Sequence, residues 1–209
     1  MSEAISPPQP EQKQLTHRQI MVIFSGLMLA LLLAALDQTI VSTALLTIVN
    51  DLNKANGSAE MPWVVTAYLL ASTAVSPIYG KLADLYGRKR ILLFGLVLFS
   101  LGSILSGTSQ SMGQLIAMRT LQGLGAGAVG PIVLTMLGDL FTLHERAKVQ
   151  GYFSAVWGLS SVAGPLIGGD LTEYVGWRWV FLVSVPFAIV AIIMLAWYVT
   201  EPHVDRKDW

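Results

Sequence analysis

The feature that most constrains this chain is a series of long apolar windows that contain no charged residue. The hydrocarbon core of a bilayer is about 30 Å thick, and a helix that rises about 1.5 Å per residue needs roughly 20 apolar residues to cross it. The third window is too long for one helix and is split by the polar stretch Gly107 to Ser111. The windows predict membrane-spanning helices over residues 20 to 49, 62 to 82, 91 to 109, 112 to 137, 149 to 169 and 178 to 199.

Composition excludes a water-soluble domain. Of the 209 residues, 54% are apolar and 12% are charged, and the mean hydropathy is +0.61. Soluble domains carry about 25% charged residues. The formal net charge is zero, so nothing suggests a nucleic acid partner. We expect an all-α membrane protein of six transmembrane helices, embedded in the lipid bilayer, that is not an enzyme and holds no cofactor.

The basic residues near the span ends are unevenly distributed, and lysine and arginine in short loops stay in the cytoplasm. With the amino terminus inside, the outer side has only Lys54 and Arg178. The cytoplasmic side has ten basic residues: Lys13, Arg18, Lys81, Arg88, Lys89, Arg90, Arg146, Lys148, Arg206 and Lys207. We therefore expect a multi-pass protein of the cell membrane with both termini in the cytoplasm.

The chain divides into three parts by composition. Residues 1 to 18 are polar and rich in proline, which is typical of a disordered cytoplasmic tail. Residues 19 to 200 form the six-span unit, and residues 201 to 209 form a short cytoplasmic tail. Six spans divide as three plus three, and many transporters repeat such a triplet with inverted topology around a site near the membrane midplane.

Two ionisable residues, Asp37 and Arg119, lie well inside predicted spans. Insertion of such a charged side chain at the centre of a membrane helix costs on the order of 2.5 to 3.5 kcal/mol, so a functional role is the default interpretation. Burial raises the pKa of a carboxyl group and a nearby guanidinium lowers it, so Asp37 can exchange a proton for a cationic substrate. The alternative is a neutral ion pair that locks two helices together.

The loop between the second and third spans is short and strongly charged. Gly80 would permit close helix approach, and Gly87 suits a turn with positive φ. Asp84 can offset neighbouring arginines, and Asp139 is a candidate partner for Arg88. The alternative is a cytoplasmic anchor of basic residues around an ordinary turn.

Three motifs in this order resemble the major facilitator superfamily. The loop residues Gly80, Asp84, Gly87, Arg88 and Lys89 match its signature, in which the aspartate and the arginine latch the two halves together. The fourth span is similar to its Arg-x-x-Gln-Gly-x-Gly-Ala motif, whose arginine, here Arg119, is implicated in proton transfer. The fifth span resembles a pattern found in exporters rather than importers, carried by Gly158, Gly164, Pro165, Gly168 and Gly169.

The glycines of the fifth span also have a mechanical interpretation. Gly164 and Gly168 form a small-xxx-small face for close helix packing, and Pro165 permits a bend. The runs 36 to 41 and 177 to 181 are similar to the fourteen-helix drug:proton antiporter branch. Ser42 and Leu46 depart from that branch, which commonly has asparagine and proline there.

The resemblance implies a proton-coupled exporter of small, lipophilic, cationic drug-like compounds. Trp63, Tyr68 and Gln122 are the candidate substrate contacts, although Trp63, Trp177 and Trp179 also fit an outer aromatic belt. The family has twelve or fourteen spans, so we expect a truncated chain whose partner is a second six- or eight-helix half, or a second copy of itself. The alternative functions are an inactive or regulatory half-transporter and a nutrient importer.

Two other patterns are rejected. The glycines at 123, 125 and 127 follow no strand, so they do not predict a nucleotide loop. His17, His144 and His203 lie in separate segments without the spacing of metal ligands.

Overall fold

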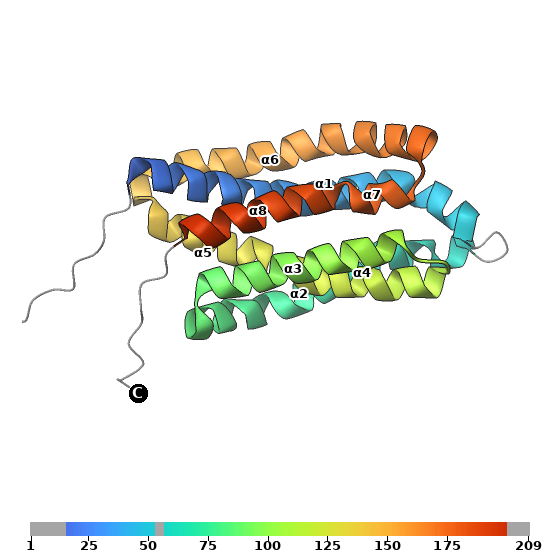
Figure 1. Cartoon of the computed structure of the whole chain (residues 1–209), viewed down its shortest axis with the longest axis horizontal. Helices are drawn as coiled ribbons and strands as arrows, with labels where there is room; N and C mark the ends of the chain where they lie inside the picture. The colour runs from blue at the N-terminus through green and yellow to red at the C-terminus, as the bar shows by residue number, and fades with distance from the viewer. Residues whose placement is uncertain (1–15, 53–56, 200–209) are drawn as a thin grey trace, which may run out of the picture.

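The computed structural model describes residues 16–52 and 57–199. Its helices run side by side along one direction and form an elongated bundle (Figure 1). Within these described ranges there is no β-strand. Most of the amino-terminal tail and all of the carboxy-terminal tail lie outside the described residues, so the disorder predicted for residues 1 to 18 stays a prediction.

The described part of the chain forms eight α-helices and one π-helical turn. In chain order they are α1 (His17–Leu52), α2 (Gly57–Tyr86), α3 (Arg88–Gly107), α4 (Met112–Ala126), α5 (Val129–Leu140), α6 (Leu143–Asp170), the π-helix η1 (Leu171–Val175), α7 (Arg178–Leu182) and α8 (Ser184–Tyr198).

These elements form six long helical segments, called rods below, as the sequence predicts. α4 and α5 together make the fourth rod, over Met112–Leu140, and α7 and α8 make the sixth, over Arg178–Tyr198. Several rods extend beyond the predicted spans, because helical hydrogen bonding continues where hydrophobicity ends. The predicted split of the third apolar window is confirmed, since α3 ends at Gly107 and α4 begins at Met112.

Five of the rods are long and apolar enough to cross a membrane. The remaining one is α6, the fifth in chain order; its 28 residues are enough for a crossing, but glycine and serine lower its hydropathy. It lies along α1 in the bundle (Figure 1). The chain is an all-α membrane protein, and α6 is mostly exposed, apart from a few buried positions such as Gly164 and Gly168, which face α1.

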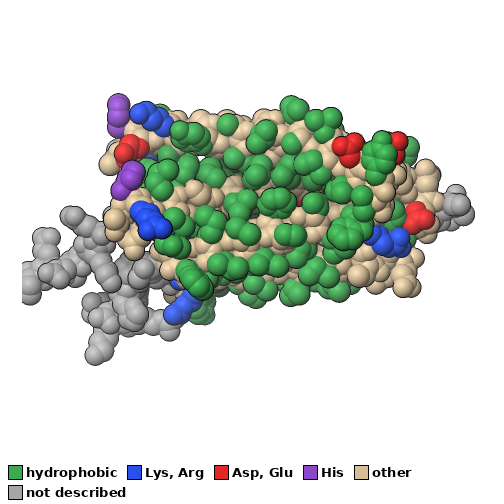
Figure 2. All heavy atoms as spheres, turned by 45° about the horizontal axis from the view of Figure 1, so that its top comes forward, with side chains coloured by type: hydrophobic (Ala, Val, Ile, Leu, Met, Phe, Trp, Pro, Cys, Tyr) green, Lys and Arg blue, Asp and Glu red, His purple; other side chains and the backbone are tan. Residues whose placement is uncertain are grey.

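The ends of the molecule differ from its middle. Charged side chains gather toward the two ends, and hydrophobic side chains cover the face between them (Figure 2). The first turn of α1 and the last turn of α8 lie at the same end of the bundle, as an even number of crossings requires (Figure 1).

Glycines bring α4 into direct contact with its neighbours. A Cβ atom at Gly102 of α3 would lie 2.6 Å from the Gln122 Cα atom, and one at Gly125 would lie 2.3 Å from the Phe99 backbone nitrogen. A Cβ atom at Gly123 would lie 2.4 Å from the carbonyl oxygen of Tyr68 on α2. Any larger residue would force the helices apart, so these glycines place α4 deep between α2 and α3.

Candidate functional site

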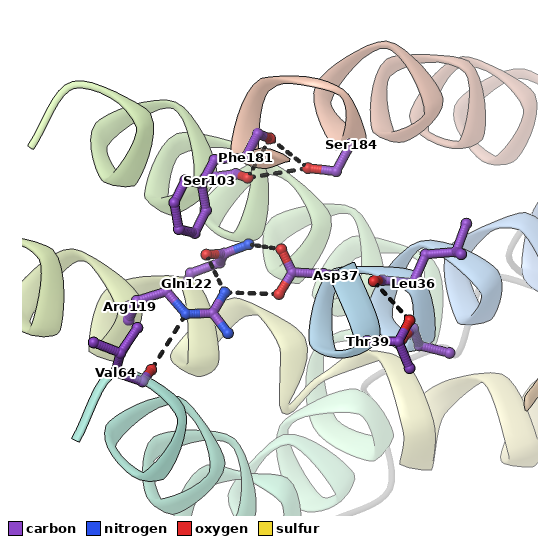
Figure 3. A network of polar contacts seen from close by, with 10 residues as sticks. Leu36, Asp37, Thr39, Val64, Ser103, Arg119, Gln122, Phe181 and Ser184 are labelled. Carbon is purple, nitrogen blue, oxygen red and sulfur yellow. Dashed lines mark hydrogen bonds and ion pairs between the residues drawn. The ribbon is translucent and has the colours of Figure 1, made fainter. Parts of the chain in front are cut away.

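The two predicted membrane charges meet in the centre of the bundle (Figure 3). Arg119 Nη1 donates to Asp37 Oδ2 at 2.7 Å and to Gln122 Oε1 at 2.7 Å. Gln122 Nε2 donates to the second carboxylate oxygen, Asp37 Oδ1, at 2.8 Å. The three side chains therefore form a closed ring of charge-assisted hydrogen bonds between α1 and α4.

This network is fully buried. Asp37 and Arg119 are each 1% exposed, and Gln122 is 0% exposed. Arg119 Nε also faces the Val64 carbonyl oxygen of α2 at 3.4 Å. A buried charge pair is tolerated only when both partners and their remaining hydrogen-bonding groups are satisfied. The Gln122 amide meets this need, because it accepts from the arginine and donates to the carboxylate.

Local sequence explains why these groups converge. Arg119 and Gln122 are three residues apart on α4, so both point from one face of that helix. Gly102 sits directly against the Gln122 backbone, which lets α3 close over this part of α4. The sequence predicts similar heights for Asp37 and Arg119 in the bilayer, but only packing decides that they face each other.

Two aromatic rings surround the arginine. The Arg119 Cζ atom lies 4.3 Å from the centroid of the Tyr68 ring on α2 and 5.8 Å from that of Phe181 on α7. Tyr68 is 1% exposed. No sequence pattern predicts this contact, because cation–π partners are set by helix rotation and not by spacing in the chain.

The three predicted substrate contacts have different surroundings. Trp63 is 53% exposed, which suits either a substrate contact or the outer aromatic belt. Tyr68 and Gln122 are both buried against Arg119 instead. In this conformation a substrate cannot reach them, and neither can a cation compete directly for Asp37.

The charged loop between α2 and α3 contacts two other helices. Arg88 forms an ion pair with Asp139 of α5, the partner that the sequence suggests. Lys89 Nζ donates to the carbonyl oxygens of Ala196 and Val199, at 2.6 Å each. Lysine at a helix end satisfies carbonyls that have no helical partner, so this side chain caps the end of α8.

The glycines and the aspartate of this loop are placed as follows. Gly87 has φ of 96°, which confirms the predicted turn. A Cβ atom at Gly80 would meet nothing within 4 Å, so the predicted close helix approach there is wrong within the described residues. Asp84 is exposed and pairs with no basic residue among those that the structure describes.

The glycine face of α6 packs against α1. A Cβ atom at Gly164 would lie 2.0 Å from Thr39 Oγ1, and one at Gly168 would lie 2.9 Å from the Ile40 carbonyl oxygen. The predicted small-xxx-small packing is therefore present. Gly158 and Gly169 would meet nothing within 4 Å. Pro165 is accommodated inside a continuous α6, and the regular helix ends only at the π-helical turn η1.

A polar cluster at the end of the bundle opposite the α2–α3 loop was missed by sequence reasoning. Asp51, near the end of α1, accepts a hydrogen bond from Trp177 Nε1 at 2.8 Å and pairs with Arg178 Nη1 at 3.5 Å. The two charges border a cavity of about 390 Å³. Trp177 is 4% exposed, so its predicted place in an aromatic belt is wrong, whereas Trp179 is 52% exposed.

The described residues include no cluster of three or more side chains suited to a metal ion. His17 starts α1, and His144 lies in the first turn of α6. His203 lies outside the described residues.

Comparison with known proteins places this architecture in a family. The Major Facilitator Superfamily profile matches residues 27–208. Multidrug resistance protein 3 of Bacillus subtilis is 46% identical over 88% of this chain and 36% of its own length. The multidrug transporter protein MdtP of the same organism is 46% identical over 84% of this chain and 32% of its own length. The chain thus spans about a third of each of these relatives.

A solved structure supports the same conclusion about the fold. The proton:xylose symporter XylE matches with a TM-score of 0.73, over 86% of this chain and 44% of that one, at 15% identity. At this identity the similarity concerns the fold alone. The helix bundle, the motif-bearing loop and the matched profile together show that the chain is a member of the major facilitator superfamily.

Proposed function

We propose that this chain is the amino-terminal half of a transporter that expels drug-like compounds in exchange for protons. The observation that carries the proposal is the buried ring of Asp37, Arg119 and Gln122. An ionisable pair at membrane depth marks a proton or ion pathway by default. The printed names of the two bacterial relatives support drug-like cargo.

Asp37 is the proton carrier in this proposal. Its carboxylate accepts from Arg119 and Gln122, one donor to each oxygen. A proton on either oxygen removes the negative charge and converts an acceptor into a donor. Both contacts across α1 and α4 are then weakened together, and the two helices are free to separate. Loss of the proton restores the ring.

Arg119 modulates this exchange because it keeps its charge in both states. When Asp37 is neutral, the guanidinium retains the Gln122 oxygen and the Val64 carbonyl oxygen as acceptors. Since Asp37 is buried, cationic cargo competes with the proton only after the helices have separated. The site therefore couples through a change of conformation and not through an open cavity.

The protein lies in the cell membrane with both termini in the cytoplasm, which puts Arg88, Lys89 and Asp139 on the cytoplasmic side. Exposed Asp84 and the open Gly80 are then available to latch onto a second six- or eight-helix half. The substrate is small, lipophilic and cationic.

The energy available from protons is sufficient for export. One proton that enters across 100 mV gains roughly 2.3 kcal/mol. Since each tenfold gradient costs about 1.4 kcal/mol, this sustains a substrate gradient of about fifty-fold.

Reconstitution in proteoliposomes with an imposed pH gradient tests the proposal, with ethidium as the cationic probe. We expect ethidium movement coupled to proton movement, and its loss in Asp37→Asn. Asp51→Asn is the matched control, because it removes an exposed carboxylate from the same helix. Undiminished coupled exchange in Asp37→Asn would discard Asp37 as the carrier.

A second candidate is a half-transporter without transport of its own. The complete pairing of the buried ring favours it, because such a ring also locks α1 to α4 without moving a proton. This candidate predicts no coupled ethidium movement by the chain; a loss of stability in Asp37→Asn is expected under both candidates. An importer is disfavoured by the glycine and proline pattern of α6.

A further inference from the structure

The Arg119 guanidinium has two kinds of neighbour. At its edge lie the acceptors Asp37 Oδ2, at 2.7 Å, and Gln122 Oε1, at 2.7 Å. The Arg119 Cζ atom also lies over the rings of Tyr68, 4.3 Å from the centroid, and Phe181, 5.8 Å from the centroid. The edge contacts depend on the charge of Asp37, whereas the ring contacts do not.

The Tyr68 hydroxyl does not explain the position of this residue. It is buried and forms no hydrogen bond with any residue that the structure describes. The Gln38 side chain approaches it without reaching hydrogen-bond geometry. A buried tyrosine usually finds a partner for its hydroxyl. Besides its packing in the hydrophobic core, the Tyr68 ring contacts the Arg119 guanidinium.

We propose that Tyr68 is a positioning residue that keeps the Arg119 guanidinium beside Asp37 through the proton cycle, with Phe181 as a weaker second support. The proposal rests on the proposed function, because it concerns the same buried pair. A cation is attracted to the face of a ring, and the attraction is larger where water is excluded. When Asp37 takes up a proton, the ring of Tyr68 still holds the arginine.

Retention of the arginine has a functional consequence. If the guanidinium drifted away while Asp37 was neutral, the carboxyl group would keep its proton, since no positive charge would favour ionisation. A guanidinium held in place favours release of the proton and closure of the ring. Tyr68 therefore sets the pH at which Asp37 releases its proton.

Few other groups bear on this titration. The charged or titratable groups that face one another here are Asp37 of α1, Arg119 of α4 and Tyr68 of α2. From α3 the neighbour is Gly102, and from α7 it is Phe181. Neither can take up a proton. Of the other helices packed on α1, α6 carries no charged residue between Lys148 and Asp170, α8 carries none, and α5 carries only Asp139, which pairs with Arg88. A shift in the midpoint of Asp37 protonation therefore reports on the three named groups.

The experiment compares Tyr68→Leu, Phe181→Leu and the conservative Tyr68→Phe in the complete chain, reconstituted in lipid. Infrared difference spectroscopy follows protonation of the Asp37 carboxyl group, with the Asp37→Asn spectrum as the reference. This readout needs no transport. Tyr79→Leu is the matched control, because it removes a buried tyrosine ring from the same helix, at another position in the bundle core.

The midpoint is the pH at which half of the Asp37 carboxyl groups are protonated. We expect Tyr68→Leu to raise this midpoint by about one pH unit, which is a tenfold gain in proton affinity. Phe181→Leu should shift it in the same direction by less, since its ring lies farther from the arginine. Tyr68→Phe keeps the ring and should retain the original midpoint, as should Tyr79→Leu. The pH profile of ethidium exchange should move in parallel.

Several outcomes would overturn the proposal. An unchanged midpoint in a folded Tyr68→Leu protein would show that the ring does not position the arginine. A Tyr68→Phe shift as large as that of Tyr68→Leu would assign the effect to the hydroxyl. If Tyr68→Leu does not fold, an unchanged midpoint in Phe181→Leu decides against the proposal. Expected midpoint shifts in a chain without ethidium exchange would support Tyr68 and reject the proposed function alone.

Discussion

Two carboxylates on α1 are satisfied in the same way at different depths. Asp37 pairs with Arg119 and also accepts from an amide, that of Gln122. Asp51 pairs with Arg178 and also accepts from an indole, that of Trp177. The side chains of the central pair are 0% and 1% exposed, whereas those of the outer pair are 54% and 47% exposed.

The comparison shows that depth, more than the choice of partners, decides what an ion pair does. Water screens the outer pair, and exposed pairs of this kind contribute about 0 to 1 kcal/mol. The central pair has no water to replace a lost partner. Removal of one member leaves a buried charge alone, which costs about 3 to 5 kcal/mol. The same chemistry therefore gives a weak, screened ion pair at one end and a buried pair at the centre, which acts as the proton-sensitive site in the function proposed above.

The largest expected effect separates the two pairs by double-mutant cycles. Asp37→Asn or Arg119→Gln should each lower the free energy of unfolding by about 3 to 5 kcal/mol, and the double variant by less than their sum. Asp51→Asn and Arg178→Gln should each cost less than about 1 kcal/mol. Unfolding in lipid bicelles is measured for the wild type, the four single variants and the double variant of each pair. Equal coupling energies in the two cycles would refute the role given to depth.

A smaller effect tests how the central pair is supported. Gly102→Ala places a Cβ atom 2.6 Å from the Gln122 Cα atom, so α3 and α4 must separate. Overpacking of this kind costs about 1 to 3 kcal/mol. Gly113→Ala is the matched control, because a Cβ atom there meets nothing within 4 Å. Thermal unfolding monitored by circular dichroism should show a lower stability for Gly102→Ala and no loss of stability for Gly113→Ala.

The smallest effect concerns salt. When the ionic strength rises from about 0.1 M to about 1 M, the Debye length falls from about 10 Å to about 3 Å. The coupling energy between Asp51 and Arg178 should then fall by a few tenths of a kcal/mol. That between Asp37 and Arg119 should stay constant, since both are buried. A central coupling that weakens with salt would mean that water reaches Asp37.

Sequence reasoning succeeded where a residue acts through its own helix or loop. The six rods, the positive φ of Gly87 and the packing face of Gly164 and Gly168 could all be predicted from local patterns. The pairing of Arg88 with Asp139 could be suggested because both are charged and lie near the ends of adjacent spans.

It failed where a side chain acts on a distant element. Lys89 caps α8 through backbone carbonyl oxygens, which carry no residue identity that a sequence pattern could reveal. Trp177 is buried because its indole reaches Asp51, at the far end of α1. Tyr68 was predicted to contact a substrate, and the rotation of α2 placed its ring over Arg119 instead.

The sequence by itself determined that this chain crosses a membrane as a bundle of helices and carries one acid and one base at bilayer depth. It could do so because hydrophobic length and the cost of buried charge act on each residue separately. Only the tertiary structure decided that Asp37, Arg119 and Gln122 form one closed network of hydrogen bonds and that the aromatic ring of Tyr68 contacts the arginine of this network. That arrangement depends on how far each helix is rotated and how closely its glycines let it approach its neighbours.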